Sequence, residues 1–342
     1  MHNISALPVV GKFEGAPVHR ITLRSAGGAV AQVLTWGAVI ADLRVPCPDG
    51  RLQNVVLGFE NFADYPPHSP YFGAVVGRYA NRISGGGFTL NGVRHDLAVN
   101  EGPATCLHGG PEGFARRIWN VTELTAESVT LGLQSPDGDQ GFPGDLDVRC
   151  RYTLCDRTTL RVAFQARTMA PTVVNLAQHA YFNLDGSPDL SGHHLQVFAD
   201  TYTPVDADDI PTGALADVTG TRFDLRQPRP VFDPDRPTRL DHNFVLSDLP
   251  GVDGLRHAAR LSAGDMALDV HTTKPGVQVY DGNKLNLAVP GHDRAHYGPR
   301  AGICLETQFF PDSPHQPCFP SAVLNPGETY AHTTDYSFSG LP

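Results

Sequence analysis

The chain has 342 residues, with 26 lysines and arginines against 36 aspartates and glutamates, and a formal net charge of −10. The charges are scattered rather than gathered in blocks, which argues against nucleic acid or an anionic membrane as a partner. Many of the 35 glycines and 29 prolines stand at apparent strand ends, as in a chain with many reversals and few long helices. Because β-rich chains often build one large sandwich, we expect a single domain over residues 1–342.

Alternating apolar and polar residues predict strands from the start of the chain. Residues 21–45 are typical of two or three short strands. Residues 88–97 alternate on both sides of Asn91-Gly92, the strongest local signal for a hairpin. Residues 146–154 and 160–166 alternate in the same way, which predicts an antiparallel hairpin with one buried face.

Further strands are expected where short apolar runs are separated by turn residues. They are residues 194–199, 259–261, 267–272, 277–280, 302–309 and 330–338. The polar, turn-rich stretch 204–229 is typical of a surface connection, and no segment shows a sustained helical stripe. The sequence therefore predicts an all-β fold of many antiparallel strands packed as sheets.

A histidine stands inside a run of apolar and β-forming residues at 171–184. If this run is extended, its side chains alternate between two faces. His179, Tyr181 and Asn183 then share one face, and Ala180, Phe182 and Leu184 share the other. Such a strand can be anchored on the core while it presents an imidazole, a phenol and an amide to a cleft. The alternative is a partly buried histidine that is satisfied by a backbone carbonyl.

A carboxylate lies within the apolar strand predicted at 302–309. Period two puts Glu306 and Gln308 on one face, and Ile303 and Leu305 on the other. A carboxylate in the middle of such a strand is costly unless it is paired or functional. A structural ion pair with an arginine is the competing interpretation.

Three further places combine polar groups that could bind a ligand. Residues 77–83 carry Asn81 and Arg82 ahead of three glycines, whose spacing fits neither a Walker loop nor a dinucleotide loop. His108 precedes two glycines that permit a tight turn, and Asp241 stands at the entrance of an apolar segment. His108 could equally be structural or merely exposed, and Asp241 could be a turn or capping residue.

The 15 histidines raise the question of a metal site, for which a cupin-like sandwich with several histidines and one glutamate is the natural version. The adjacent pair His193-His194 would face opposite ways on a strand, and no His-x-His motif with a glutamate has the usual spacing. A serine nucleophile in a Gly-x-Ser-x-Gly context is also absent. We therefore expect no metal.

The six cysteines lie in ordinary segments without zinc-type spacing, which indicates a reducing compartment. The N-terminal sequence lacks a basic start followed by an apolar run, and no later segment is apolar enough to span a bilayer. We expect a soluble, cytoplasmic protein without a membrane partner. The sequence does not indicate an oligomeric state.

Taken in order along the chain, these sequence segments resemble those of the aldose 1-epimerase family, the galactose mutarotases. The matching segments run nearly end to end and are residues 70–83, 107–110, 137–144, 175–184, 202–205, 210–213, 241–244, 275–278 and 305–308. The resemblance implies a large antiparallel β-sandwich of the galactose mutarotase type. It also implies interconversion of the α and β anomers of a free aldohexose such as glucose or galactose, with a small-molecule monosaccharide as partner and no cofactor.

Carried over position by position, the resemblance makes His179 the general acid and Glu306 the general base. Its sugar-contacting positions are Asn81, Arg82, His108, Asp241 and Gln278, with Tyr181 nearby. Two departures bear on the choice of sugar. Ala177-Gln178 stand where the family usually has Thr-Asn, and His315 stands where an asparagine is common.

Anomerisation needs an acid and a base on opposite sides of the sugar, because the C1 hydroxyl loses a proton while the ring oxygen gains one. A carboxylate is ionised at neutral pH, and an imidazole needs only a modest upward shift in pKa, which a nearby carboxylate can supply. Two other interpretations stay open. One is a non-catalytic carbohydrate-binding β-sandwich, and the other is a glycosidase in which Glu306 and Asp241 flank the bond.

Overall fold

The computed structural model describes residues 7–47, 49–156, 158–232, 239–247, 251 and 254–340. The start of the chain, on which the expectation about a targeting segment rests, lies partly outside this range. Within the described residues, no helix is both long and apolar enough to cross a membrane.

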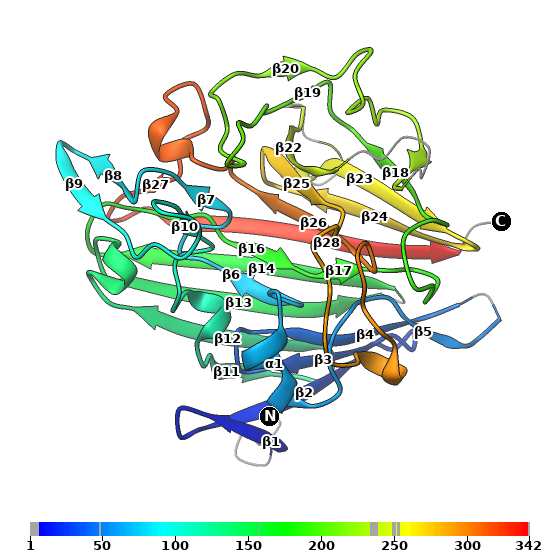
Figure 1. The fold of residues 1–342 in the computed structure, drawn as a ribbon. Helices are drawn as coiled ribbons and strands as arrows, with labels where there is room; N and C mark the ends of the chain where they lie inside the picture. Colours follow the sequence, from blue (N-terminus) through cyan, green and yellow to red (C-terminus); the bar gives the residue numbers. More distant parts are fainter. Residues whose placement is uncertain are drawn as a thin grey trace.

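The largest sheet has nine strands and spans the width of the molecule (Figure 1). In spatial order they are β11 (Asn120–Leu124), β12 (Ser128–Ser135), β13 (Leu146–Cys155), β14 (Thr159–Thr168), β28 (Tyr330–Gly340), β24 (Met266–Thr272), β23 (Arg256–Ala263), β18 (His194–Val197) and β21 (Arg229–Pro230). β13 and β14 form the hairpin predicted at 146–166, paired without a break from Leu146 and Thr168 to Cys155 and Thr159. One face of this hairpin is buried, as predicted.

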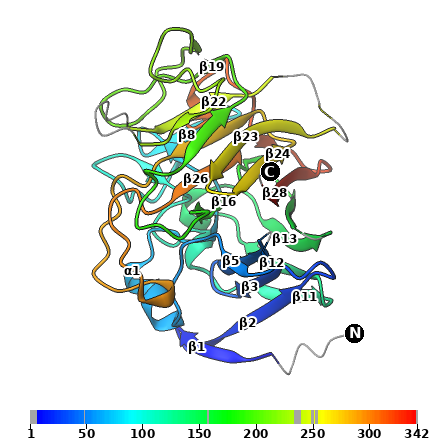
Figure 2. The same ribbon diagram turned by 90° about the vertical axis from the view of Figure 1, so that its right-hand side faces the viewer.

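Two smaller sheets pack with the large one. The first holds β1 (Val9–Phe13), β2 (Ala16–Arg24), β3 (Val30–Leu34), β4 (Ile40–Pro46) and β5 (Leu52–Asn54). The second holds β17 (Tyr181–Phe182), β26 (Ile303–Gln308), β25 (Gly276–Tyr280), β22 (Asp241–Val245), β19 (Thr201–Tyr202) and β20 (Ala216–Asp217). Figure 2 shows the first sheet low in the molecule and the second above it. One apolar cluster joins all three sheets, since it contains Leu43 of β4, Val148 of β13 and Leu305 of β26.

Four two-stranded ladders complete the described part of the fold. They pair β6 (Ala74–Val76) with β16 (Ala177–His179), β7 (Arg82–Ile83) with β10 (Cys106–Leu107), β8 (Gly87–Leu90) with β9 (Val93–Asp96), and β15 (Thr172–Val173) with β27 (Val323–Leu324). Helices are short: α1 (Tyr65–His68), and the 3-10 turns η2 (Phe62–Asp64), η3 (Phe114–Arg116), η4 (Asp139–Gly141), η6 (His292–Arg294) and η7 (Ser313–His315). The predicted all-β sandwich with few helices is confirmed.

The local strand predictions hold as well. Asn91 and Gly92 join β8 to β9 with φ values of 50° and 79°, the positive values that a two-residue hairpin turn of matching twist requires. The six further strands are present as β18, β23, β24, β25, β26 and β28, with ends shifted by a few residues. The stretch 204–229 is mostly irregular, as expected.

The histidine-bearing stretch 171–184 is not one continuous strand. It contains β15, β16 and β17, which pair with three different partners, β27, β6 and β26. Each of these short strands is buried, because the stretch passes between layers rather than along one sheet face. The predicted alternation nevertheless holds. Ala180, Phe182 and Leu184 belong to the main core, and the rings of His179 and Tyr181 lie 5.1 Å apart away from it.

Candidate active site

A cavity of about 220 Å³ lies where the six-stranded sheet meets the β7–β10 ladder. Seven of the eight predicted site residues line it: Asn81, Arg82, His108, His179, Tyr181, Asp241 and Glu306. Gln278 is buried but does not line the cavity. The volume is below the roughly 300–1,000 Å³ of pockets for drug-sized ligands, so the cavity suits a smaller molecule.

The register of the six-stranded sheet brings the polar side chains to one face. Glu306 of β26 pairs with Gln278 of β25. Two residues away along β25 and β26, the next row on the same face holds Tyr181 of β17, Cys304 of β26, Tyr280 of β25 and Asp241 of β22, on four neighbouring strands. Because paired residues point to the same side and the side-chain period is two, both rows face the cavity side. The polar face predicted for residues 302–309 therefore belongs to the site.

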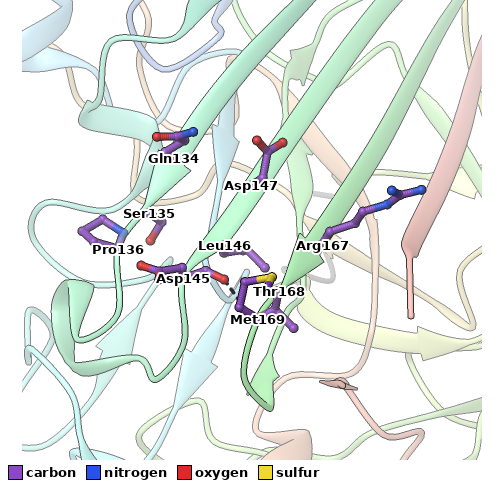
Figure 3. Close-up of a pocket in the computed structure, with 9 residues that line it drawn as sticks. All are labelled: Gln134, Ser135, Pro136, Asp145, Leu146, Asp147, Arg167, Thr168 and Met169. Carbon is purple, nitrogen blue, oxygen red and sulfur yellow. Dashed lines mark hydrogen bonds between the residues drawn. The ribbon is translucent and has the colours of Figure 1, made fainter. Parts of the chain in front are cut away.

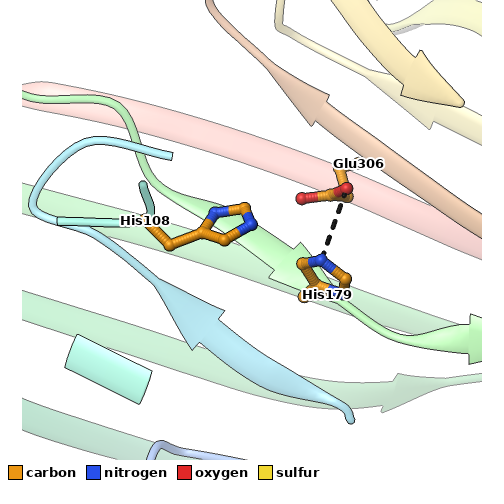
Figure 4. A group of neighbouring side chains, drawn as sticks. All are labelled: His108, His179 and Glu306. Carbon is orange, nitrogen blue, oxygen red and sulfur yellow. Dashed lines mark ion pairs between the residues drawn. The ribbon is translucent and has the colours of Figure 1, made fainter. Parts of the chain in front are cut away.

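The imidazole of His179 and the carboxylate of Glu306 face each other across the cavity floor. Nε2 of His179 lies 3.7 Å from Oε1 of Glu306, and the two side chains are only 5% and 2% exposed (Figure 4). His179 ends β16, and its backbone carbonyl accepts a hydrogen bond from the N–H of Gly73. The ring is further enclosed by those of Tyr71, His108 and Tyr181, at 5.6, 5.1 and 5.1 Å.

Burial moves the two groups toward their neutral forms. It lowers the pKa of His179 to about 4 and raises the pKa of Glu306 well above its usual range, the latter with help from the charge of Asp241. The upward shift expected for the His179 pKa is therefore wrong. The loss of water around the ring outweighs the attraction of the nearby carboxyl, whose ionised form burial also disfavours. Burial therefore favours the form of the pair in which the transferable proton lies on Glu306.

Among the residues that the structure describes, His108, His179 and Glu306 form the group of side chains that could be considered for a metal, with ligand atoms within 4.8 Å of one another (Figure 4). The backbone N–H of Asn81, however, donates to Nδ1 of His108 at 3.1 Å. Because a backbone N–H can only donate, the proton of neutral His108 must lie on Nε2. Nε2–H is a donor for a hydroxyl oxygen and has no free lone pair for a metal.

Asp241 is held by two neighbours. Its Oδ1 accepts from Nε2 of Gln278 at 2.8 Å, and its Oδ2 accepts from Nη2 of Arg239 at 3.0 Å. Gln278 thus reaches the cavity through Asp241, while its own Oε1 is buried without a hydrogen-bond partner among the described residues.

Arg82 combines the two roles that the sequence left open. Its Nε and Nη2 donate to the two carboxylate oxygens of Glu101 at 2.6 and 2.9 Å, and Asp209 lies 3.7 Å away. Its side chain is 6% exposed and lines the cavity. Because the ion pair fixes the guanidinium, Arg82 forms a rigid, positively charged part of the cavity wall.

Comparison with known proteins identifies the family. Residues 19–337 match the family model for aldose 1-epimerase. The galactose mutarotases of Bos taurus and Homo sapiens are each 44% identical to this chain over 314 residues, which is 90% of this chain and of each relative. The aldose 1-epimerase of Escherichia coli K12 is 37% identical over 337 residues, 95% of this chain and 96% of that one. The chain belongs to the aldose 1-epimerase family.

Solved structures show the same fold. A GalM/aldose epimerase homologue from C. elegans has a TM-score of 0.89 at 31% identity and covers 95% of this chain and 100% of its own. Galactose 1-epimerase from Lactobacillus acidophilus NCFM has a TM-score of 0.82 at 28% identity, with 98% of both chains covered. The predicted fold of the galactose mutarotase type is confirmed, and the chain is an isomerase of this family.

The two departures from the family pattern lie outside the cavity lining. Gln178 is buried, and its Nε2 donates to the carbonyl of Gly73, next to the β6–β16 ladder. His315 bonds through Nδ1 to Asp312 at 2.7 Å, and Asp312 accepts from the N–H of Ser84. Both residues support segments of the site, and neither replaces a group in it.

Several cavity residues of this family member were not singled out from the sequence. Tyr71, Glu101, Tyr280 and Lys284 all line the cavity. Tyr71 lies within the matching segment 70–83, and its φ of 68° belongs to the left-handed region that functional sites often use. Glu101 had no local signal, because it pairs with an arginine 19 residues away.

A larger hollow of about 540 Å³ lies elsewhere, beside the ends of β12, β13 and β14 (Figure 3). It is lined by Gln134, Ser135, Pro136, Asp145, Leu146, Asp147, Arg167, Thr168 and Met169. Its two carboxylates are exposed, and it has no histidine. Although it is larger, this hollow lacks an acid–base pair, so we place the chemistry in the smaller cavity.

Proposed function

We propose that the chain interconverts the α and β anomers of free aldohexoses such as glucose and galactose by acid–base-catalysed ring opening. The observation that supports this most is the buried pair of His179 and Glu306 inside a cavity of monosaccharide size. The pair shares one transferable proton, which is what anomerisation needs.

The reaction follows from the positions of these two groups. The reactive form has the proton on His179 and the charge on Glu306, and a proton shift produces it once Nε2 and Oε1, which lie 3.7 Å apart, close to hydrogen-bond distance. Glu306 then removes the proton of the C1 hydroxyl while His179 donates its proton to the ring oxygen, and the bond between C1 and the ring oxygen breaks. The open aldehyde rotates about the bond between C1 and C2. Closure on the other face returns both protons. A positioned acid or base of this kind typically contributes a factor of about 10² to 10⁴ to the rate.

The remaining polar groups hold the sugar. Asn81, Arg82, His108 and Asp241 line the cavity and offer donors and acceptors for ring hydroxyls, which is the positioning contribution to the rate. Gln278 orients Asp241, and Tyr181 uses its hydroxyl on the carbonyl of Pro70, so its ring packs beside His179 instead of binding through oxygen. A neutral sugar fits this set, since the cations Arg82 and Arg239 already have carboxylate partners.

The two alternatives have less support. A purely carbohydrate-binding sandwich has no need for a carboxyl and an imidazole buried against each other at a cost in free energy. A glycosidase would need Asp241 as a free second carboxylate, yet both of its oxygens already accept hydrogen bonds.

The cell compartment and partners follow as proposals. All six cysteines are free, four of them buried, which supports a reducing compartment such as the cytoplasm. We propose the monosaccharide as the partner, with no nucleic acid, since the net charge is −10.

Polarimetry of freshly dissolved pure anomers tests the function. We expect the enzyme to speed the decay of optical rotation for α-glucose and α-galactose, and the initial rates with xylose included would rank the sugars. An aryl glycoside should release no aryl alcohol. Binding of sugar without faster mutarotation would overturn the proposal in favour of a binding protein, and aryl glycoside cleavage would overturn it in favour of a glycosidase.

A further inference from the structure

The second ring nitrogen of His179 has a partner that the mechanism has not used. Sγ of Cys304 lies 3.5 Å from Nδ1, while Nε2 of the same ring faces Glu306. The thiol is fully buried and free. Among the described residues it is the side-chain hydrogen-bond partner of this imidazole, apart from the 3.7 Å approach of Glu306.

The sheet register places this thiol. Cys304 stands two residues before Glu306 on β26, so both side chains point to the cavity side. It pairs with Tyr181 of β17, which follows His179 by two residues in the chain. β26 therefore carries the groups at both ring nitrogens, and the ring itself stands at the end of β16, directly before the strand that pairs with β26.

A thiol at Nδ1 suits both protonation states of the ring. When the ring is neutral with its proton on Nδ1, this N–H can donate to the sulfur, which is a weak acceptor, and Nε2 keeps a lone pair that can take a proton from Glu306. When the ring is cationic, Nδ1–H still donates to the sulfur, and Nε2–H faces Glu306 and the sugar. A carboxylate at this place would instead hold the ring proton strongly, as it does in many His sites. Burial raises the pKa of the thiol well above its usual range, so it stays protonated.

We propose that Cys304 is a positioning residue that fixes the tautomer of His179, so that protons enter and leave the ring only through Nε2, on the side of Glu306 and the sugar. The kinetic part of this proposal rests on the proposed function. The tautomer itself does not, because it is a property of the free protein.

The tautomer can be read directly by NMR on the full chain labelled with ¹⁵N-histidine. The signal of His179 is identified by its loss in His179→Asn, and the two tautomers differ in the ¹⁵N shifts of the ring nitrogens. We expect the Nδ1–H form in the wild type, a mixture in Cys304→Ala, and a return to Nδ1–H in Cys304→Ser, whose hydroxyl can also accept. An Nε2–H form in the wild type, or an unchanged Nδ1–H form in Cys304→Ala, would overturn the proposal.

Kinetics give the second measurement. In Cys304→Ala we expect kcat to fall about tenfold with KM nearly unchanged, and Cys304→Ser to recover most of the loss. Cys150→Ala is the matched control, since Cys150 is equally buried but lies on β13 in the main core. It should change neither kcat nor the His179 signal. An equal loss of kcat in both alanine variants would make the role of Cys304 structural only.

The outcomes separate this proposal from the proposed function. If the wild type does not catalyse mutarotation but the His179 tautomer changes in Cys304→Ala, the function fails and the positioning role stands. If mutarotation is fast and Cys304→Ala leaves both the tautomer and kcat unchanged, only the positioning role fails.

Discussion

The β13–β14 hairpin and the two segments that carry the catalytic pair are built on opposite plans. The hairpin pairs over ten residues without a break, and buried and exposed residues alternate along β13. The stretch 171–184 pairs with three different strands in turn, and all six residues of β26 are buried, with a carboxyl among them. The charged side chains of the hairpin stay exposed to water, whereas the charged side chains of the site are buried. The regular scaffold therefore contributes to the stability of the fold, whereas the buried polar groups of the site reduce it.

The polar groups around Glu306 show this cost. Oε2 of Glu306, Oε1 of Gln278 and both amide atoms of Asn243 and Gln308 are buried without partners among the described residues. Each buried polar atom without a hydrogen bond costs about 1–3 kcal/mol. Burial of the apolar cluster that joins the three sheets stabilises the fold and opposes such losses. Changes in the site should therefore affect the rate, and changes in the scaffold should affect the stability.

The largest effect is expected from Glu306→Gln, which keeps the shape and removes the proton acceptor. The rate of mutarotation should fall by at least about 10², measured by polarimetry. The melting temperature at neutral pH should be equal to the wild type or higher. The pKa of Glu306 is raised in the folded state, so its contribution to stability is lost as pH rises, and glutamine removes this loss.

His179→Asn should lose a similar factor, and the double variant should lose less than the product of the two, because the groups act in one linked step. Asp147→Asn, on the exposed face of β13, is the control and should change neither rate nor melting. Near-wild-type turnover by folded Glu306→Gln would mean that the base is misassigned, and Asp241 would be the next residue to test.

Arg78 and Arg82 stand four positions apart, the first in the scaffold and the second at the site. Nη1 and Nη2 of Arg78 donate to the carbonyls of Ser135, Pro136, Pro143 and Gly144, and the side chain is buried away from the cavity. Arg78→Met should lower the free energy of unfolding by about 3 kcal/mol, because it leaves these carbonyls without donors. The turnover of each folded molecule should stay the same.

Arg82→Met should show the reverse pattern. Its partner Glu101 is one third exposed and can return to water, so the free energy of unfolding should fall by only about 1 kcal/mol. The value of kcat/KM should fall about 10- to 100-fold, since the cationic wall of the cavity is lost. Urea titration and initial rates on the same samples measure both quantities. A large loss of stability with unchanged kinetics in Arg82→Met would make this arginine purely structural.

A change of pH is expected to alter the rate of mutarotation less than these substitutions do. The active form is the pair with one proton, so activity should fall below a pH of about 4, where His179 takes up a second proton. It should fall again at high pH, above the raised pKa of Glu306, where the pair loses its proton. Both limbs report the pair as a whole. An acid limb between pH 6 and 7 would contradict this assignment.

The regular parts of the molecule could be predicted from the sequence, and the irregular parts could not. Period-two alternation is enough to find the β13–β14 hairpin, and Asn91-Gly92 is enough to find the turn between β8 and β9. The same period placed Glu306 on the cavity side, whereas Cys304, two residues earlier on the same face, was not singled out. The break of 171–184 into three strands has no local signal, since it depends on partners far along the chain.

Long-range pairs limit the prediction of the site in the same way. Glu101 gains its role from Arg82, and the shift of the His179 pKa comes from enclosure by rings of separate segments, among them Tyr71 and His108. Neither pairing nor enclosure can be read from a single stretch of sequence. The roles of the site residues and the single-domain organisation stay predictions.

Removal of metal ions is expected to have no effect on the rate of mutarotation. The candidate ligand group contains His108, whose Nδ1 is occupied by the N–H of Asn81 and whose Nε2 must therefore carry the proton. A metal would have to displace that proton, which leaves only His179 and Glu306, and burial raises the pKa of Glu306, which opposes the charged carboxylate that a metal needs. Dialysis against a strong chelator should leave the rate of mutarotation unchanged, with zinc readdition as the control. A loss of activity that only added metal restores would mean that the hydrogen bond from Asn81 breaks in the working enzyme and that the site is a metal centre.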